Sequence, residues 1–125
     1  MYKKTIVIVT GGFDPLHEGH IEYFNDAKAL SETYPTELAG AGQLWVGLNS
    51  DEWLARKKGS PFMTFVSRHV VISNIRSVDK VIQVNDDDNT SIDAIRQVMA
   101  VVDQNTRIVF ANGGDRTLGN VPEKL

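Results

Sequence analysis

Two histidines, His17 and His20, lie three residues apart, directly after a short glycine-containing segment. The residues Ile6–Val9 before that segment are apolar and β-branched, as in a buried strand, and Gly11 and Gly12 follow them. A strand that passes through a glycine turn into a helix presents free backbone N–H groups and the positive end of the helix dipole to an anion. Imidazoles titrate near neutral pH and suit phosphate chemistry there. We therefore interpret this segment as a phosphate-binding site.

The segment differs from other glycine-rich phosphate loops. It lacks the Gly-x-Gly-x-x-Gly pattern of dinucleotide-binding folds and the lysine of the P-loop, so the histidines would supply part of the phosphate contact. Taken alone, a histidine pair at this spacing would more often cap and pack the start of a helix. The glycine turn behind a strand favours the functional interpretation over capping alone.

The elements that must position these residues alternate along the chain. Short runs rich in Val and Ile predict strands at Thr5–Thr10, Leu44–Leu48, Val81–Val84 and Ile108–Ala111. Apolar residues at helical spacing predict helices over about 18–30, 64–75 and 91–102. This order predicts an α/β fold, a Rossmann-like doubly wound parallel sheet of about four to five strands with helices on both faces.

Three polar segments separate the predicted elements. Ser31–Gln43 is a loop longer than most α/β connections, a length typical of functional loops. Lys57–Pro61 is a second break. The acidic residues Asp86–Asp88 begin a third break, and we interpret them as a surface loop that caps a helix rather than as a metal site.

Composition limits the classes of function. The 125 residues suit one domain, 1–125, and the net charge of −3 argues against a nucleic-acid partner. The absence of cysteine excludes disulfides, thiolate zinc sites and cysteine nucleophiles. No apolar stretch approaches the ~20 residues of a membrane span, so we expect no membrane partner and a cytoplasmic location.

The residues Gly12-Phe13-Asp14, followed by His17-x-Gly19-His20, resemble the signature of the H-x-G-H nucleotidyltransferase superfamily, in its cytidylyltransferase-like form. That superfamily includes cytidylyltransferases of glycerol 3-phosphate, choline phosphate and ethanolamine phosphate. It also includes the adenylyltransferases that make NAD, coenzyme A precursors and ADP-heptose. The resemblance extends over nearly the whole chain, from Thr5 to about Asp115.

Further residues match the same superfamily. Asn49, Ser50 and Asp51 follow the second predicted strand, where the carboxyl ends of parallel strands line a ligand crevice. Capping of the next helix by Ser50 or Asp51 is the alternative interpretation. The glycine turn after the fourth predicted strand would border the nucleotide base, and its residues are Asn112, Gly113, Gly114, Asp115 and Arg116.

The resemblance also implies roles for basic residues. Lys57 and Lys58, expected in a polar loop, and Arg68, expected in the following helix, would contact phosphates of the nucleotide and the acceptor. The alternative for each lysine is a solvated surface position. The implied catalytic residues are therefore His17, His20, Lys57 and Arg68. The implied nucleotide-binding residues are Gly11, Gly12, Phe13, Asp14, Gly19, Asn49, Asp51, Lys58 and Asn112 to Arg116.

The reaction implied is attack of an acceptor phosphate on the α-phosphate of a nucleoside triphosphate, with pyrophosphate leaving. Mg²⁺ would accompany the triphosphate without a dense carboxylate cage. We favour CTP with a small alcohol phosphate such as glycerol 3-phosphate over ATP with a sugar phosphate such as heptose 1-phosphate. A homodimer is expected from the superfamily.

The C-terminal region departs from the superfamily pattern. The arginine-to-serine/threonine signature that grips the triphosphate has no clear copy after Asp115. A doubly wound sheet also usually carries a further strand and helix, so we expect either a shortened form or an edge completed by a partner. The missing signature supports a third hypothesis, a nucleotide-binding module without turnover.

Overall fold

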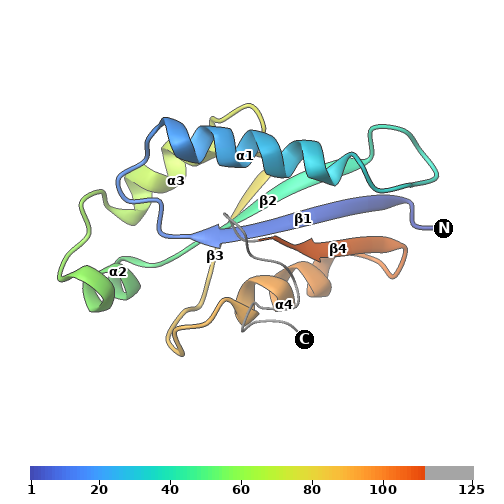
Figure 1. Cartoon of the computed structure of the whole chain (residues 1–125). Coiled ribbons are helices and arrows are strands. Elements are labelled where there is room, and N and C mark those ends of the chain that lie inside the picture. The colour runs from blue at the N-terminus through green and yellow to red at the C-terminus, as the bar shows by residue number, and fades with distance from the viewer. Residues whose placement is uncertain (112–125) are drawn as a thin grey trace.

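A parallel four-stranded sheet forms the centre of the molecule. The computed structural model of the chain describes residues 1–111. The strands lie in the order β3-β2-β1-β4, and every neighbouring pair is parallel (Figure 1). Their bounds are β1 Lys4–Gly11, β2 Gly42–Leu48, β3 Lys80–Gln83 and β4 Thr106–Phe110. All four strands correspond to predicted apolar runs.

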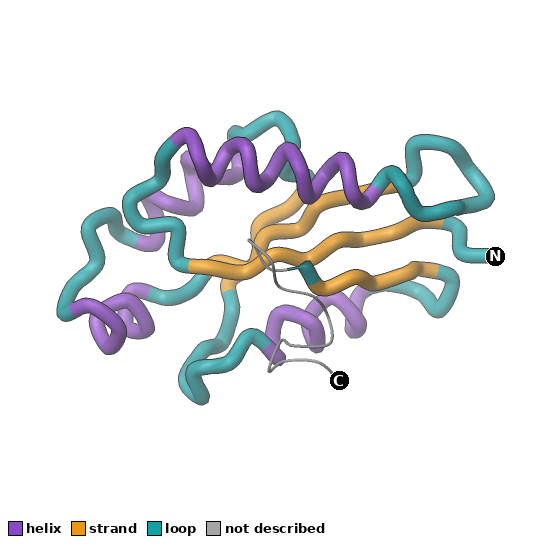
Figure 2. The backbone as a smooth tube through the Cα atoms, in the orientation of Figure 1, coloured by secondary structure: helices purple, strands orange, loops and turns teal. Residues whose placement is uncertain are grey.

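Helices cover both faces of this sheet (Figure 2). On one side lie α1 and α3, and α4 lies on the other side, while α2 lies beyond the end of the sheet (Figure 1). Their bounds are α1 Glu18–Ser31, α2 Asp51–Lys58, α3 Phe65–Ser73 and α4 Ile92–Val101. The predicted doubly wound α/β fold is therefore confirmed.

The continuous apolar run in β1 follows from burial on both faces. Val7 and Val9 join the core under α1 and α3, whereas Ile6 and Ile8 join a second core under α4. All four side chains are fully buried. A strand with one solvated face would alternate polar and apolar residues, so the unbroken run was a correct signal for a central parallel strand.

The strand order creates a switch point at the carboxyl ends of β1 and β4. The chain moves outward from β1 to β2 and β3, and then returns to the other side of β1 to form β4. In open α/β sheets this reversal leaves a crevice that binds ligands. The segment from Gly11 to His20 leaves β1 at this edge and leads into α1 (Figure 1).

Helix α2 differs from the sequence prediction. Lys57 and Lys58 form the last turn of α2, so the expectation that they lie in a loop is wrong. The helix was missed because Leu54 is its only buried residue, and apolar periodicity is therefore absent. Its signals are polar instead: Ser50 caps the N-terminus, acidic residues occupy the first turn and basic residues the last.

The long segment between α1 and β2 lies away from the crevice. It connects to the amino end of β2 and is drawn near the N-terminus, at the opposite end of the sheet from α2 (Figure 1). Arg107 of β4 holds it by donating to the carbonyl of Pro35 at 3.2 Å and by lying 5.0 Å from the ring centroid of Tyr34. These contacts give the segment a structural role.

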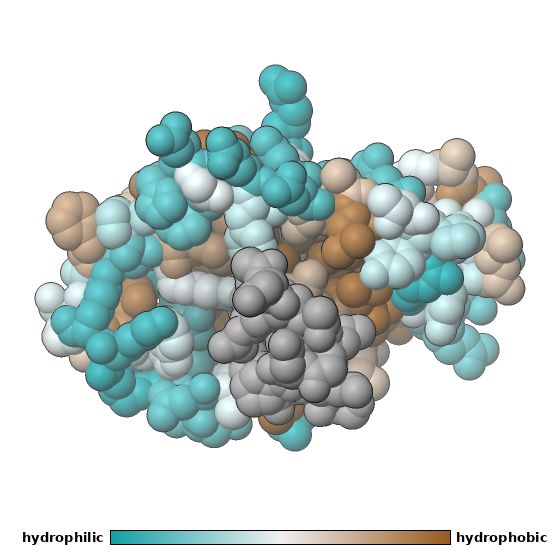
Figure 3. Space-filling view, viewed as in Figure 1, coloured by the Kyte–Doolittle hydropathy of each residue, from teal (hydrophilic) through white to brown (hydrophobic). Residues whose placement is uncertain are grey.

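Most of the surface in one view is polar. Figure 3 shows hydrophilic side chains around the periphery and an apolar patch over the area where Figure 1 draws β1 and β4. Among the helices of residues 1–111, none combines the length and the apolar character needed to cross a membrane.

Candidate active site

Both histidines form the cap of α1. His17 is the N-cap residue, and its Nδ1 accepts a hydrogen bond from the backbone N–H of Gly19 at 3.0 Å. The backbone N–H of His17 donates in turn to Nδ1 of His20 at 3.3 Å. This is a capping box built from two imidazoles. The rings stack with their centroids 4.0 Å apart. The capping role that the sequence left open is therefore present.

Capping leaves the other nitrogen of each ring available. A neutral imidazole has one accepting and one donating nitrogen, so a ring that accepts at Nδ1 carries its proton on Nε2. Both rings accept at Nδ1. Within residues 1–111 neither Nε2 of His17 nor that of His20 has a hydrogen-bond partner. The start of α1 therefore presents two N–H donors where the helix dipole already favours an anion.

The surroundings of His20 favour its neutral form. Burial lowers the pKa of His20 below its ordinary value of 6.5, and the adjacent His17 lowers it further. The neutral ring is the form that accepts at Nδ1 and donates from Nε2. The ring also meets Phe13 edge-on at a centroid distance of 5.2 Å, which fixes its position from the other side.

The residues between β1 and α1 are tightly packed. Phe13 is buried and has a φ of 51°, a left-handed conformation that is strained for a residue with a side chain. A Cβ at Gly11 would lie 2.8 Å from the Phe13 ring, and a Cβ at Gly19 would lie 2.9 Å from the His17 ring. These two glycines therefore give the aromatic rings the space they need.

Asp14 is engaged by the protein rather than exposed to the crevice. Its side chain is buried and forms an ion pair with Lys58 at 2.7 Å. Its carboxylate also accepts backbone N–H groups from Phe62 at 2.6 Å and Met63 at 2.5 Å. Burial by itself raises the pKa of Asp14, but these hydrogen bonds outweigh it and the net pKa is lowered. Asp14 and Lys58 thus tie the turn after β1 to the segment after α2.

Arg68 is fully buried among the segments that follow β1, β2 and α2. Its Nη1 donates to the carbonyl oxygens of Gly12 at 2.9 Å and Asn49 at 2.8 Å. Its Nη2 donates to the Asp51 carboxylate at 2.7 Å, and its Nε donates to the Met63 carbonyl at 3.1 Å. The guanidinium therefore joins the turn after β1 to the residues after β2. It directs these four bonds to protein acceptors.

A second polar network was missed in the sequence. The Asp86 side chain, expected on the surface, is buried and accepts from Asn49 Nδ2 at 3.0 Å. It also accepts from the backbone N–H of Ser50 at 2.8 Å and the Ser50 hydroxyl at 2.7 Å. Ser50 still caps α2 through the N–H of Trp53. Nothing in the run of three aspartates distinguishes the one that turns inward, because its partners lie more than thirty residues away.

The structure thus brings many of the sequence-predicted residues to one edge. His17, His20 and Gly19 form the helix start, while Asn49 and Asp51 are joined to the turn after β1 through Arg68. The last predicted group, Asn112, Gly113, Gly114, Asp115 and Arg116, lies outside the described residues.

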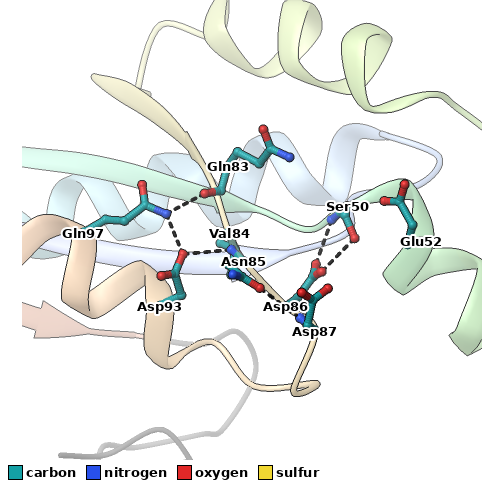
Figure 4. Close-up of a pocket in the computed structure, with 9 residues that line it drawn as sticks. All are labelled: Ser50, Glu52, Gln83, Val84, Asn85, Asp86, Asp87, Asp93 and Gln97. Atoms are coloured by element: carbon teal, nitrogen blue, oxygen red, sulfur yellow. Dashed lines mark hydrogen bonds between the residues drawn. The ribbon is translucent and has the colours of Figure 1, made fainter.

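An acidic cavity opens beside this edge, between the end of β3, α4 and the start of α2. Its volume is about 360 Å³, and Figure 4 shows residues that line it. The residues that line it are Ser50, Glu52, Gln83, Val84, Asn85, Asp86, Asp87, Asp93 and Gln97. Figure 4 shows Asp86 turned toward Ser50, whereas Asp93 is turned toward Gln97 and the backbone of Asn85. In residues 1–111 no group of three or more His, Cys, Asp or Glu side chains is arranged to hold a metal ion.

Comparison with known proteins identifies the family. Residues 8–124 match the cytidylyltransferase-like family. The chain belongs to that family. The match covers the histidine cap, the Arg68 network, the second half of β1 and the other three strands, so the resemblance carried by the H-x-G-H residues is confirmed. The chain is a nucleotidyltransferase-type enzyme of this family.

Two curated relatives carry the name bifunctional protein HldE. The protein from Wolinella succinogenes is 35% identical over 97 residues, which cover 76% of this chain and 18% of the relative. The protein from a Marinomonas species is 30% identical over 123 residues, which cover 97% of this chain and 22% of the relative. The chain therefore spans about a fifth of the length of these relatives.

A solved structure has the same fold. It is described as the lipopolysaccharide core biosynthesis protein from Thermoplasma volcanium, and it superposes with a TM-score of 0.61 at 23% identity. The match covers 90% of this chain and 99% of the solved chain. At this identity the likeness supports the fold.

Proposed function

We propose that this nucleotidyltransferase transfers an adenylyl group from ATP to a sugar phosphate such as heptose 1-phosphate. The relatives named HldE support this choice over CMP transfer from CTP to glycerol 3-phosphate, which the sequence favoured and which becomes the second candidate. In the proposed reaction an oxygen of the acceptor phosphate forms a bond to the α-phosphorus. The bond from that phosphorus to the bridging oxygen breaks, and pyrophosphate leaves.

The observation that carries the proposal is the pair of unengaged Nε2–H donors at the start of α1. Negative charge spreads over the non-bridging oxygens as the α-phosphorus becomes five-coordinate. Fixed donors aimed at that charge accelerate the reaction because they need no reorganisation. His17 and His20 would donate to these oxygens, and the backbone N–H groups of α1 would add further donors.

The other predicted residues divide into two roles in this proposal. Lys57 and the N–H groups near Gly12 would contact phosphates. Arg68, Asp14 and Lys58 would position the turn after β1, because their polar groups already bind protein atoms. This departs from the sequence hypothesis for all three residues: we now propose Arg68 as a positioning residue rather than a phosphate ligand, and Asp14 and Lys58 as positioning residues rather than nucleotide ligands.

The donor set suits a metal ion that arrives with the nucleotide. Imidazole N–H and backbone N–H groups bind anions, so Mg²⁺ would be held by triphosphate oxygens and water rather than by a carboxylate cluster. The ion would neutralise phosphate charge when bound. A homodimer and a cytoplasmic location complete the proposal and follow from the superfamily expectation and the composition.

Pyrophosphate release from a panel of substrate pairs tests the proposal. We expect release with ATP, Mg²⁺ and heptose 1-phosphate, and little release with CTP and glycerol 3-phosphate. The reverse pattern would replace the proposal by the second candidate. A thermal-shift screen of the same nucleotides runs in parallel, since a ligand stabilises the state that it binds. Stabilisation without release for any pair would indicate a binding module without turnover.

A further inference from the structure

The helix that the sequence did not predict, α2, lines a second cavity of about 310 Å³. Among residues 1–111, those that line it are Trp53, Arg56, Lys57 and Asn89. The first three lie on α2, and Asn89 lies in the segment between β3 and α4. The cavity therefore lies at the same carboxyl edge of the sheet as the histidine cap, with an indole and two cations on its walls.

The arginine in this cavity is held in place. Its Nε donates to the Asn89 side-chain oxygen at 3.2 Å, and Nη2 donates to the Asp86 carbonyl at 2.8 Å. The Asn89 backbone is fixed as well, because its N–H donates to the same carbonyl at 2.9 Å and its φ is 62°. Within residues 1–111 the Nη1 group of Arg56 has no acceptor. A fixed guanidinium with an unengaged N–H pair suits a phosphate.

The lysine adds a second positive charge. Lys57 Nζ lies 4.7 Å from the centroid of the Trp53 ring, a cation–π contact that localises the ammonium. Among the described ion pairs none involves Lys57 or Arg56. The cavity therefore holds two cations that no described carboxylate pairs with, and Coulomb attraction favours an anionic ligand there.

The neighbouring acidic cavity has the opposite charge, so an anionic ligand would distinguish between the two cavities. Glu52, Asp87 and Asp93 line it, and none of its described lining residues is Lys or Arg (Figure 4). A phosphorylated ligand would be repelled there and attracted to the cavity of Trp53 and Arg56. Both cavities border α2, so the side chains of this one helix separate a negative pocket from a positive one.

The Trp53 ring, which lines the positive cavity, lies close to the turn that leads to the histidines. A Cβ on Gly12 would lie 3.4 Å from the Trp53 ring, and Lys58 donates to the Asp14 carbonyl at 2.8 Å. The first contact places the Trp53 ring beside Gly12, and the second ties the last residue of α2 to the same turn. A ligand in the cavity would therefore lie next to the region where the proposed chemistry takes place.

We propose that Trp53, Arg56, Lys57 and Asn89 form the acceptor subsite and that its ligand is a monosaccharide phosphate. This inference rests on the proposed function and assigns its second substrate to a place. Arg56 and Lys57 bind the phosphate, the indole supplies an apolar wall for the sugar ring, and the Asn89 amide N–H₂ donates to a hydroxyl. A volume of about 310 Å³ lies at the lower end of the range for small-molecule sites, which suits a monosaccharide phosphate.

Intrinsic fluorescence measures this binding without turnover. The chain has two tryptophans, Trp45 and Trp53, so a Trp45→Phe background isolates the signal of Trp53. We expect a saturable change on titration with heptose 1-phosphate or glucose 1-phosphate, and none with the unphosphorylated sugars. A change with ATP alone that sugar phosphates do not produce would overturn the assignment.

Three single variants sharpen the titration. Arg56→Gln and Lys57→Gln should each raise the Kd for the sugar phosphate about tenfold or more, because a hydrogen bond to a charged group is lost. The Lys57 variant removes no hydrogen bond that the structure describes, so it separates binding from folding. Arg76→Gln, at an exposed position between α3 and β3, removes the same charge and should leave the Kd unchanged.

Pyrophosphate release separates the two proposals. Arg56→Gln should raise KM for the sugar phosphate about tenfold and change KM for ATP less than twofold. If Arg56→Gln and Lys57→Gln both release pyrophosphate with an unchanged KM for the sugar phosphate, the subsite is refuted and the proposed function stands. A Trp53 fluorescence change with sugar phosphate, but no pyrophosphate release, would leave the subsite standing and refute the proposed function.

Discussion

The histidine pair and Arg68 lie at the same edge of the sheet but differ in whether their hydrogen-bond donors are already engaged by the protein. His17 and His20 use Nδ1 to accept from the backbone and keep Nε2 unengaged within the described residues. Arg68 is fully buried and donates to four protein oxygens. A substrate phosphate could therefore accept hydrogen bonds from the two histidines, whereas the Arg68 donors are largely occupied.

The comparison shows why proximity to a site does not define a role. A charged side chain acts on a ligand only through donors that the protein has not already satisfied. Arg68 and the histidines are both required by the proposed site, but in different ways. Loss of Arg68 should appear first in folding, and loss of a histidine should appear first in turnover. The following experiments test that division, from the largest expected effect to the smallest.

Replacement of Arg68 by Met should lower the free energy of unfolding by about 3–5 kcal/mol, since it strands the carbonyls of Gly12 and Asn49 and the Asp51 carboxylate. Urea unfolding measures the loss. Arg76→Met, at an exposed position, is the matched control and should change the free energy by less than about 0.5 kcal/mol. An Arg68→Met protein of normal stability that has lost ATP binding would restore Arg68 as a phosphate ligand.

Removal of either histidine should lower kcat by about 10²–10³-fold, equivalent to about 2.7–4 kcal/mol of transition-state stabilisation. His17→Asn is the most informative variant, because Asn is a favoured N-cap residue and lacks the Nε2 donor. Its free energy of unfolding should lie within about 0.5 kcal/mol of that of the parent protein, while its turnover should still be lost. Pyrophosphate release measures the rate. Unchanged turnover in both His17→Asn and His20→Ala would contradict the assigned role.

A methyl group at Gly19 should affect turnover through His17 alone. The added Cβ would lie 2.9 Å from Cε1 of the His17 ring, so the ring must move. Because catalytic groups displaced by about 1 Å can lose up to 10²-fold, we expect Gly19→Ala to lower kcat by tenfold or more. The neighbouring Glu18→Ala, on the exposed side of the same turn, should have little effect. Equal kcat values for the two variants would mean that the ring position is unimportant.

The smallest expected effect is the pH dependence from His20. Its pKa in the folded protein is below the ordinary value of 6.5, so the unfolded chain binds more protons between those two values. The free energy of unfolding should therefore rise with pH in that interval. The contribution is present above 6.5 and is lost as the pH falls through the folded-state pKa. NMR titration of the His20 Cε1 proton measures the pKa, and a value above 6.5 would contradict the neutral ring.

The sequence was most informative where the physics is local. The unbroken apolar run of β1 predicted a strand buried on both faces, because side chains alternate between the two faces of a sheet. The three-residue spacing of His17 and His20 placed both rings on the first turn of α1. Short-range hydrogen bonds and residue periodicity determine such features, and both are visible in a few consecutive letters.

The sequence was least informative where a polar side chain has distant partners. Whether Arg68 faces a ligand or the protein depends on the carbonyls of Gly12 and Asn49, which lie 56 and 19 positions away. Asp86 becomes a buried acceptor because β2 and β3 end side by side and bring Ser50 to it. Helix α2 lacked an apolar periodicity because its stabilising contacts are mainly caps and charges.

By itself, then, the sequence determined the doubly wound fold and the place of the two histidines at the start of α1, since these follow from local pattern. Only the tertiary structure decided which donors remain for a ligand, because that depends on which acceptors the fold brings within reach. The same reason separates the two pockets beside α2: charges from helices and loops far apart in the chain meet there. Arg68 donates to protein oxygens, whereas within the described residues Arg56, His17 and His20 keep unengaged donors, which we propose bind phosphate.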